Sequence, residues 1–428
     1  MSNVPQLRFS EFSREWEEKR LGNISNKIMY GIGSSAIQFD GTNKYLRITD
    51  IDESSRTFIP NPLTSPDGII KEKYKLVEGD IVFARTGASV GKSYLYNHKD
   101  GNLIYAGFLI KVHIKDANPY FVYAHTFKEY YNKWVQVMSV RSGQPGINAE
   151  EYKLLPIKLP SKPEQEKIAS FLSSVDTKIE QLTSKTKLLQ EYKKGVMQKI
   201  FSQEIRFHPK NISSQAQGTD DDGSDKVNGE AREGTLGWYP EWVEKKLGAI
   251  AAFTKGKGIS KEDIVEDGEI ECIRYGELYT EYNEIIIDTT SKTNLSSDDL
   301  VFSKYNDIII PSSGETSIDI ATASCVLKDD IVLGGDLNII RTNENGIFLA
   351  YYLNNAKKYD IAKLAQGSSV IHLYAVHLKT LKINLPSLKE QTKIANFLSS
   401  IDSKIEQVQK QLDSTKELKK ALLQQMFV

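Results

Sequence analysis

The sequence EQEKIASFLSSVDTKIEQ, from Glu164 to Gln181, recurs from Glu390 to Gln407 as EQTKIANFLSSIDSKIEQ. Fourteen of the eighteen positions are identical at a constant offset of 226 residues, where average residue usage gives about one chance match. The same offset aligns Leu-Pro at 159 and 160 with Leu-Pro at 385 and 386, and Trp16 with Trp242. The chain is therefore two copies of one unit, each running from a Trp-led opening through a different middle region into a shared segment.

Both copies of the shared segment begin like a helix. Ser161 precedes Glu164 by three residues, as Ser387 precedes Glu390; in this pattern the Ser caps a first-turn N–H and the Glu reaches back to the cap. Apolar residues then recur in steps of four and three, which is typical of a coiled coil. They are Ile168, Leu172, Val175, Ile179, Leu182, Leu189, Val196 and Ile200 in one copy, and Ile394, Leu398, Ile401, Ile405, Val408, Leu412, Leu422 and Met426 in the other.

Each helix is long enough to act as a spacer. About 40 residues at about 1.5 Å per residue make a rod of about 60 Å. One apolar stripe on such a rod needs a partner, and the nearest candidate is the other copy; the alternative is a helix that packs only on its own domain. Because the second middle region follows the first helix and leads into the second, a helix pair would be antiparallel with one middle region at each end.

The two middle regions share a pattern of strands and turns. Strand-like runs at 44–48 and 271–274 are followed by buried-strand runs at 79–83 and 306–310. Aromatic-rich stretches at 120–134 and 348–359 predict one helix in each region, with aromatics that belong to the core. We therefore expect an α+β protein, in which two mixed α/β domains are separated by a pair of long antiparallel coiled-coil helices with a pseudo-two-fold internal repeat.

The expected boundaries follow from the repeat. A first domain spans 1–160, a central helix 161–203, a second domain 237–386 and a C-terminal helix 387–428. Residues 204–236 are polar, bear glycine and are almost free of large apolar side chains, which predicts a flexible linker.

Composition limits the class of protein. The chain has 428 residues, of which 40% are apolar, and 55 Lys plus Arg nearly cancel 56 Asp plus Glu. No apolar run approaches about 18 residues and the first residues lack a signal-peptide pattern, so we expect a cytoplasmic protein with no membrane contact. Cys272 and Cys325 are far apart in the sequence and in no CxxC pair, which argues against a disulfide framework or a zinc site. A formal charge of -1 is low for a protein that binds nucleic acid by backbone charge alone.

The doubled arrangement resembles the specificity subunit of type I restriction-modification systems. The resemblance is carried by Leu159-Pro160 to Phe201, by Leu385-Pro386 to Phe427, by the Trp16–Gly22 and Trp242–Gly248 openings, and by the loop Gly143-Gln144-Pro145-Gly146-Ile147-Asn148. It implies that each middle region is a target recognition domain reading one half of a split, asymmetric DNA sequence. It also implies that the helices fix the gap between the half-sites and dock modification subunits, with Phe171 and Phe397 as candidate contacts.

Loops that follow the buried strands, and loops that precede the helices, carry side chains suited to base edges or phosphates. The expected DNA-binding residues of the first domain are Arg85, Thr86, Ser89, Lys92, Arg141, Ser142 and Gln144. Those of the second are Ser312, Ser313, Thr316, Ser317, Gln366, Ser368, Ser369 and His372, with Lys255 and Lys257 as phosphate contacts. The second loop reads Ser-Ser-Val-Ile-His where the first reads Gln-Pro-Gly-Ile-Asn, so equivalent roles for the two loops are left open.

The sequence contains no recognisable catalytic pattern. It has no Asn-Pro-Pro-Tyr or Asp-Pro-Pro-Tyr tetrapeptide and no GxxxxGK[ST] phosphate loop. We expect a non-catalytic chain without a cofactor or metal of its own. The resemblance implies double-stranded DNA, two methyltransferase subunits carrying S-adenosylmethionine, and motor-nuclease subunits using ATP and Mg²⁺ as partners. The alternatives are a scaffold whose end domains bind protein, favoured by the near-neutral charge, and a self-contained DNA enzyme with unfamiliar motifs.

Overall fold

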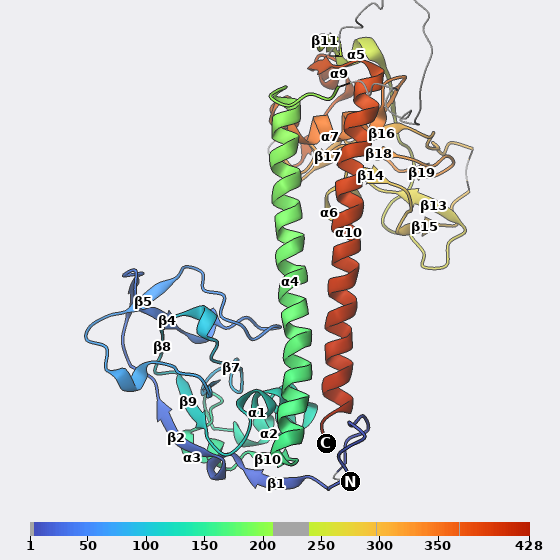
Figure 1. Cartoon of the computed structure of the whole chain (residues 1–428). Helices are drawn as coiled ribbons and strands as arrows, with labels where there is room; N and C mark the ends of the chain where they lie inside the picture. Colours follow the sequence, from blue (N-terminus) through green and yellow to red (C-terminus); the bar gives the residue numbers. More distant parts are fainter. Residues whose placement is uncertain (1–3, 209–238, 297, 368) are drawn as a thin grey trace, which may run out of the picture. The chain divides into compact units, whose positions relative to one another are not determined.

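The computed structural model describes residues 4–208, 239–296, 298–367 and 369–428. It divides into two compact units, each with mixed helix and sheet content (Figure 1). Unit 1 comprises Met1–Lys185 and Val408–Val428, and unit 2 comprises Thr186–Gln407. Most of the expected linker, from residue 209 to its end at 236, lies outside the described residues.

Unit 1 is organised around a four-stranded sheet in the order β2-β9-β6-β7, with three two-stranded pairs, β1-β10, β3-β5 and β4-β8. The strands are β1 (Glu17–Arg20), β2 (Ser25–Tyr30), β3 (Ala36–Gln38), β4 (Lys44–Leu46), β5 (Thr64–Pro66), β6 (Asp80–Ala84), β7 (Ser93–Leu95), β8 (Leu103–Tyr105), β9 (Leu109–Ile114) and β10 (Pro156–Leu159). Short 3-10 helices occupy Leu21–Asn23, Ile48–Asp50, Glu72–Tyr74 and His98–Asp100. The expected strands near 44 and 79 are confirmed as β4 and β6.

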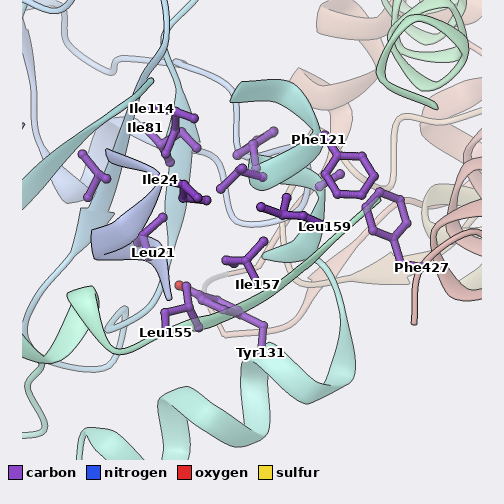
Figure 2. Packing of buried hydrophobic residues seen from close by; sticks show 14 of the residues in the cluster. Leu21, Ile24, Ile81, Ile114, Phe121, Tyr131, Leu155, Ile157, Leu159 and Phe427 are labelled. Atoms are coloured by element: carbon purple, nitrogen blue, oxygen red, sulfur yellow. The ribbon is translucent and has the colours of Figure 1, made fainter. Parts of the chain in front are cut away.

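The helices of unit 1 are α1 (Pro119–His125), α2 (Glu129–Met138) and α3 (Ala149–Lys153). The single helix expected over 120–134 is thus wrong, because the helical hydrogen bonding is interrupted between His125 and Glu129. Its aromatics are core residues as expected, since Phe121 and Tyr131 are buried. Figure 2 shows Phe121 facing Phe427, with Leu159 beside them; the rings of Phe121 and Phe427 stack at 4.9 Å.

Unit 2 repeats this plan with a five-stranded sheet, β12-β20-β16-β18-β14, a three-stranded sheet, β15-β13-β19, and two pairs, β11-β22 and β17-β21. Its strands are β11 (Val243–Lys246), β12 (Ala251–Lys255), β13 (Ile270–Ile273), β14 (Ile285–Ile286), β15 (Ser291–Thr293), β16 (Asp307–Pro311), β17 (Ser313–Gly314), β18 (Ser324–Val326), β19 (Val332–Leu333), β20 (Leu337–Thr342), β21 (Ile371–His372) and β22 (Lys382–Leu385). Its short helices are α5 (Leu247–Ile250), α6 (Glu277–Thr280), α7 (Gly346–Asn355), α8 (Lys358–Leu364) and α9 (Ala375–Leu378). Here too the stretch at 348–359 forms parts of two helices, α7 and α8.

The two long helices are α4 (Lys162–Phe201) and α10 (Leu388–Gln425), and both contribute to both units. In unit 1 the start of α4 packs on the end of α10, where Ile168 and Leu172 share a buried cluster with Leu422 and Met426. In unit 2 the end of α4 packs on the start of α10 in the same manner. Within each unit the two helices therefore run in opposite directions past one another (Figure 1).

The repeated Glu-Gln at the start of each long helix joins the helix to the rest of its unit. Glu164 is buried and accepts from the Nε and Nη2 of Arg8 at 2.7 and 2.8 Å. Its equivalent, Glu390, is buried and accepts from Arg206 at 3.2 and 2.8 Å. These carboxylates do not reach back to the cap as the Ser-x-x-Glu pattern predicted, because an arginine from another segment holds them.

The neighbouring glutamines also serve equivalent roles. The side-chain carbonyl of Gln165 accepts from the backbone N–H of Asn118, the N-cap of α1, at 3.0 Å. Gln391 accepts from Asn345, the N-cap of α7, at the same distance. The repeated pair therefore fixes the start of each long helix to the helix that covers its sheet.

A second, shorter repeat gains its meaning from the structure. Leu7-Arg8-Phe9 matches Ile205-Arg206-Phe207, at an offset of 198 instead of 226. The Leu7 N–H donates to the carbonyl of Gln425 at 2.9 Å, and the Ile205 N–H donates to that of Lys199 at 3.1 Å; residues 199 and 425 are themselves 226 apart. The start of the chain thus occupies in unit 1 the place that residues 205–207 occupy in unit 2.

Two lysines that fall among the recurring apolar residues of the long helices, Lys193 and Lys419, form ion pairs with the opposite helix. Lys193 of α4 lies 2.7 Å from Asp402 of α10 in unit 2, and Lys419 of α10 lies 2.6 Å from Asp176 of α4 in unit 1. The pairs are related by the same offset of 226, because residue i of one helix contacts residue j of the other in both units. The hydroxyl groups of Tyr351 and Tyr120 donate to Asp402 and Asp176 respectively.

Candidate nucleic-acid interface

The two loops nominated in unit 1 lie against each other. Thr86 and Gly146 form a β-bridge, the Gly87 N–H donates to the carbonyl of Pro145 at 3.0 Å, and the Ile147 N–H donates to that of Arg85 at 2.9 Å. The loop that leaves β6 and the loop that precedes α3 therefore form one surface at the end of the central sheet.

Unit 2 pairs its two nominated loops in the same register. Ser313 lies opposite His372 and Gly314 opposite Ile371 in the β17-β21 pair, and the Leu373 N–H donates to the carbonyl of Ser312 at 2.9 Å. The sequence comparison left the equivalence of the two loops open. They are equivalent in backbone placement although their side chains differ.

Five cations were nominated, and the structure separates them sharply. Four are engaged by acidic side chains: Lys92 with Glu53, Arg141 with both carboxylate oxygens of Glu151 at 2.6 Å, Lys255 with Asp336 at 3.5 Å, and Lys257 with Asp299 at 2.8 Å. The Arg85 side chain forms no hydrogen bond or ion pair with any residue that the structure describes, and its guanidinium lies over the ring of Tyr30 at 4.9 Å. Arg85 is therefore the nominated cation best able to engage a ligand.

The nominated polar side chains differ in their access to solvent. Ser142 and Gln144 in unit 1, and Thr316, Gln366 and Ser369 in unit 2, are exposed. Thr86, Ser89, Ser317 and His372 are half-buried. Ser312 and Ser313 are buried, with 6% and 5% of their surface exposed, because they belong to the paired backbone instead of a protruding loop. Ser368 lies outside the described residues.

Three aromatic residues beside the paired loops were missed from the sequence. Tyr30 and Phe108 in unit 1 are 41% and 62% exposed, and Tyr374 in unit 2 is 50% exposed. Tyr374 stacks on His372, with ring centroids 6.0 Å apart. No sequence signal singles out these positions, since their neighbourhood depends on strand pairing between distant segments.

The helix residues Phe171 and Phe397 are less open than expected for partner contacts. Phe9 packs edge-on against Phe171 at 6.0 Å, and Phe207 against Phe397 at 5.5 Å. Residues 7–9 and 205–207 thus cover part of the helix surface that was nominated for contact with modification subunits.

Other candidate chemistry is limited. Cys272 and Cys325 are free and buried, and burial raises the pKa of their thiols to about 11 and about 12. Within the described residues no group of three or more His, Cys, Asp or Glu is placed to hold a metal ion. None of the described helices is long and apolar enough to cross a membrane.

Known proteins place this architecture in a family. The family model described as "Type I restriction modification DNA specificity domain" matches twice, over residues 13–190 and 239–416. The specificity subunit of the type I restriction enzyme MjaVIII of Methanocaldococcus jannaschii is 24% identical over 443 residues, covering 98% of this chain and 94% of that protein. A second specificity subunit of that archaeon, named for the enzyme MjaX, is 25% identical over 440 residues and covers 98% and 95%.

A solved structure supports the fold over the same length. The S subunit of a type I restriction-modification system from M. genitalium matches with a TM-score of 0.61 at 18% identity, covering 99% of each chain. The two matches to the family model fall one on each copy of the sequence repeat. The chain therefore belongs to the type I restriction-modification DNA specificity family and carries that family's domain twice.

Proposed function

We propose that unit 1 and unit 2 each read one half of a bipartite, asymmetric double-stranded DNA site. The observation that carries this proposal is that the paired loops have the same backbone register in both units but different side chains. Equivalent placement with different chemistry is what two different half-sites require. Arg85 is the principal base-reading residue of unit 1, bidentate to a guanine, because its guanidinium has no competing acidic partner among the described residues and Tyr30 supports it.

The long helices serve as the spacer. We infer that α4 and α10 form one antiparallel coiled coil with a pseudo-two-fold axis, which sets the distance between the half-sites. The reciprocal pairs Lys193–Asp402 and Lys419–Asp176 support this inference, since such exchange of contacts is characteristic of a two-fold relation. A rod of about 60 Å would span about 18 base pairs at about 3.4 Å each.

The chemistry of modification and cleavage belongs to partner subunits. Two methyltransferase subunits would bring S-adenosylmethionine and dock on the helices, and motor-nuclease subunits would bring ATP and Mg²⁺. The chain itself supplies recognition and geometry. The type I restriction names of the related specificity subunits support these partners.

The test is adenine-methylation mapping across a genome after co-expression of the chain with its methyltransferase subunit. We expect a split, asymmetric motif with a fixed gap. Arg85→Ala should relax one base pair of one half-site by about 1–3 kcal/mol of discrimination and leave the other half-site intact. Lys133→Ala is the control, because Lys133 is a cation of unit 1 that lies outside the two paired loops and forms an ion pair with Glu129.

Two outcomes would contradict the proposal. Loss of both half-sites together in Arg85→Ala would show that the two units do not read DNA independently. A stable complex that methylates nothing would favour the scaffold function, for which the pairing of four of the five nominated cations with acidic residues is the main support.

A further inference from the structure

Strand register brings three residues of unit 1 together at the end of the central sheet. Ala84 of β6 lies opposite Leu109 of β9, so the next residues along, Arg85 and Phe108, lie opposite each other. The Arg85 N–H donates to the carbonyl of Phe108 at 3.1 Å. Tyr30 of β2 lies opposite Ile110 of β9. Side chains that face one another across strands, or stand two apart on one strand, share a sheet face.

The Arg85 guanidinium lies over the Tyr30 ring at 4.9 Å, and Phe108, in the turn before β9, is joined to Arg85 by a backbone hydrogen bond; we call these three the tip residues of unit 1. In the central sheet, Phe83 and Ile110 are fully buried under the helices. The tip residues stand where this cover ends, and Phe108 is 62% exposed. The Leu109 N–H donates to the carbonyl of Ala106 at 2.9 Å, so Phe108 is held in a tight turn whose backbone adjoins Arg85.

The same register identifies the tip residues of unit 2. Pro311 of β16 lies opposite Leu337 of β20, and the Ser312 N–H donates to the carbonyl of Asp336 at 2.7 Å. Ser312 thus matches Arg85, and Asp336 matches Phe108. Lys255 lies opposite Asn338, as Tyr30 lies opposite Ile110. The tip residues of unit 2 are therefore Lys255, Ser312 and Asp336.

A shared close approach supports the correspondence. A Cβ on Gly31, one residue after Tyr30, would lie 2.2 Å from the carbonyl oxygen of Ala106, and a Cβ on Gly256, one residue after Lys255, would lie 2.0 Å from that of Gly334. Only glycine fits such spacing. Both units therefore bring the same two backbone segments together at this end of the sheet.

We propose that Phe108 is a specificity-determining residue that packs on the C5-methyl group of a thymine next to the guanine read by Arg85. The inference rests on the proposed function of unit 1 and adds the base class that its aromatic tip selects. A thymine methyl is the apolar feature of the major groove, and a phenyl ring is among the side chains that contact it. An aspartate at the matching place in unit 2 offers no apolar surface, so unit 2 should be indifferent to a methyl group there.

The test is a cycle between one side chain and one methyl group. The complex of the chain with its methyltransferase subunit is titrated with duplexes carrying the mapped site, in which each thymine is replaced in turn by deoxyuridine. One replacement in the half-site of unit 1 should weaken wild-type binding about fourfold, the value of one buried methyl group. The same replacement should change binding of Phe108→Ala less than about 1.5-fold.

Two controls separate this contact from general effects. Ile69→Ala removes another apolar side chain of unit 1, one that is 92% exposed, and should keep the wild-type response to deoxyuridine. Replacements in the half-site of unit 2 should affect wild type and Phe108→Ala equally.

Phe108→Asp, which copies the tip of unit 2, should also abolish the response to deoxyuridine. The reverse change, Asp336→Phe, is unsuitable because Asp336 has a φ of 58°, where a bulky side chain is strained.

The outcomes are distinct from failure of the proposed function. A half-site for unit 1 with no A·T pair, or an equal effect of deoxyuridine on wild type and Phe108→Ala, would overturn the inference while leaving sequence recognition by unit 1 in place. Absence of any sequence-specific binding by the assembled complex would instead overturn the proposed function, and the inference with it.

Discussion

Unit 1 and unit 2 differ most where their central sheets end and least where they meet the long helices. The buried arginine–glutamate contacts and the glutamines that hold Asn118 and Asn345 are equivalent in both units. The tips carry an aromatic and cationic set in one unit, and a cationic, hydroxyl and acidic set in the other. The difference teaches that the frame can present unlike chemistry at one place without a change in the contacts that fold it.

The largest expected effect tests whether the buried arginine–glutamate contacts stabilise the two units equally. Arg206→Met should reduce the free energy of unfolding by about 3–5 kcal/mol, since it strands the buried Glu390. Arg8→Met should cost less, because Glu164 also accepts from the indole Nε1–H of Trp16 at 3.4 Å, whereas that of Trp242 has no partner among the described residues. Urea titration followed by tryptophan fluorescence measures both changes.

The control for this pair removes the stranded charge. Glu390→Gln added to Arg206→Met should restore part of the lost stability, because a neutral amide costs less to bury than an unpaired carboxylate. A loss for Arg8→Met that equals or exceeds that for Arg206→Met would show that the tryptophan contact does not distinguish the two frames.

A smaller effect concerns pH. His125 and Tyr352 occupy equivalent positions, each seven residues after the N-cap of its helix, α1 or α7. The His125 ring contacts Phe427, and the Tyr352 ring contacts Phe201. Burial lowers the pKa of His125 to about 3, so below about pH 6.5 the unfolded chain binds a proton that the folded chain does not. The free energy of unfolding is therefore highest above about pH 6.5 and decreases as the pH falls. The decrease reaches about 1.4 kcal/mol at about pH 5.5.

His125→Gln should remove this dependence on pH. The urea midpoints of wild type and variant at about pH 7.5 and about pH 5.5 measure it. Tyr352 does not titrate in this interval, because burial raises the pKa of its hydroxyl group. An equal fall in the stability of wild type and variant would assign the pH dependence to other groups.

The smallest effect separates the two helix ion pairs. Lys193 lies near two carboxylates, those of Asp402 at 2.7 Å and Glu284 at 3.1 Å, whereas Lys419 has an ion pair with Asp176 alone among the described residues. Lys193→Met should therefore cost about 1 kcal/mol more than Lys419→Met in free energy of unfolding. Glu284→Gln is the matched control and should remove most of that difference. Equal costs with Glu284 intact would leave its contact without energetic weight.

The sequence predicted those parts of the fold that depend on local pattern. The period of Ile168, Leu172 and Val175 predicted α4, and the apolar runs before Arg85 and Ser312 predicted the buried strands β6 and β16. The Ser-x-x-Glu pattern located both helix starts correctly but assigned Glu164 and Glu390 to the wrong partners. A capping motif is local, whereas Arg8 and Arg206 reach these carboxylates from elsewhere in the chain.

The candidate interface was predictable as loops but not as individual residues. Arg85 and Lys92 look alike in the sequence, yet Glu53 forms an ion pair with Lys92, whereas no described acidic residue pairs with Arg85. Phe108 could not be nominated because its place beside Arg85 depends on the register of β6 and β9. The Leu7-Arg8-Phe9 repeat is not predictable from the helix repeat, because it spans three residues and its offset differs from that of the helices.

The participation of the last residues in unit 1 has a consequence for synthesis on the ribosome. Trp16 and Phe121 pack against Phe427, so the core of unit 1 cannot form fully until Phe427 has been synthesised. All residues of unit 2 have been synthesised once the ribosome has passed residue 407. We expect the half translated second to finish folding first, while the half translated first waits with part of its apolar surface uncovered. A nascent chain stalled before α10 is complete should therefore bind chaperones through its N-terminal half.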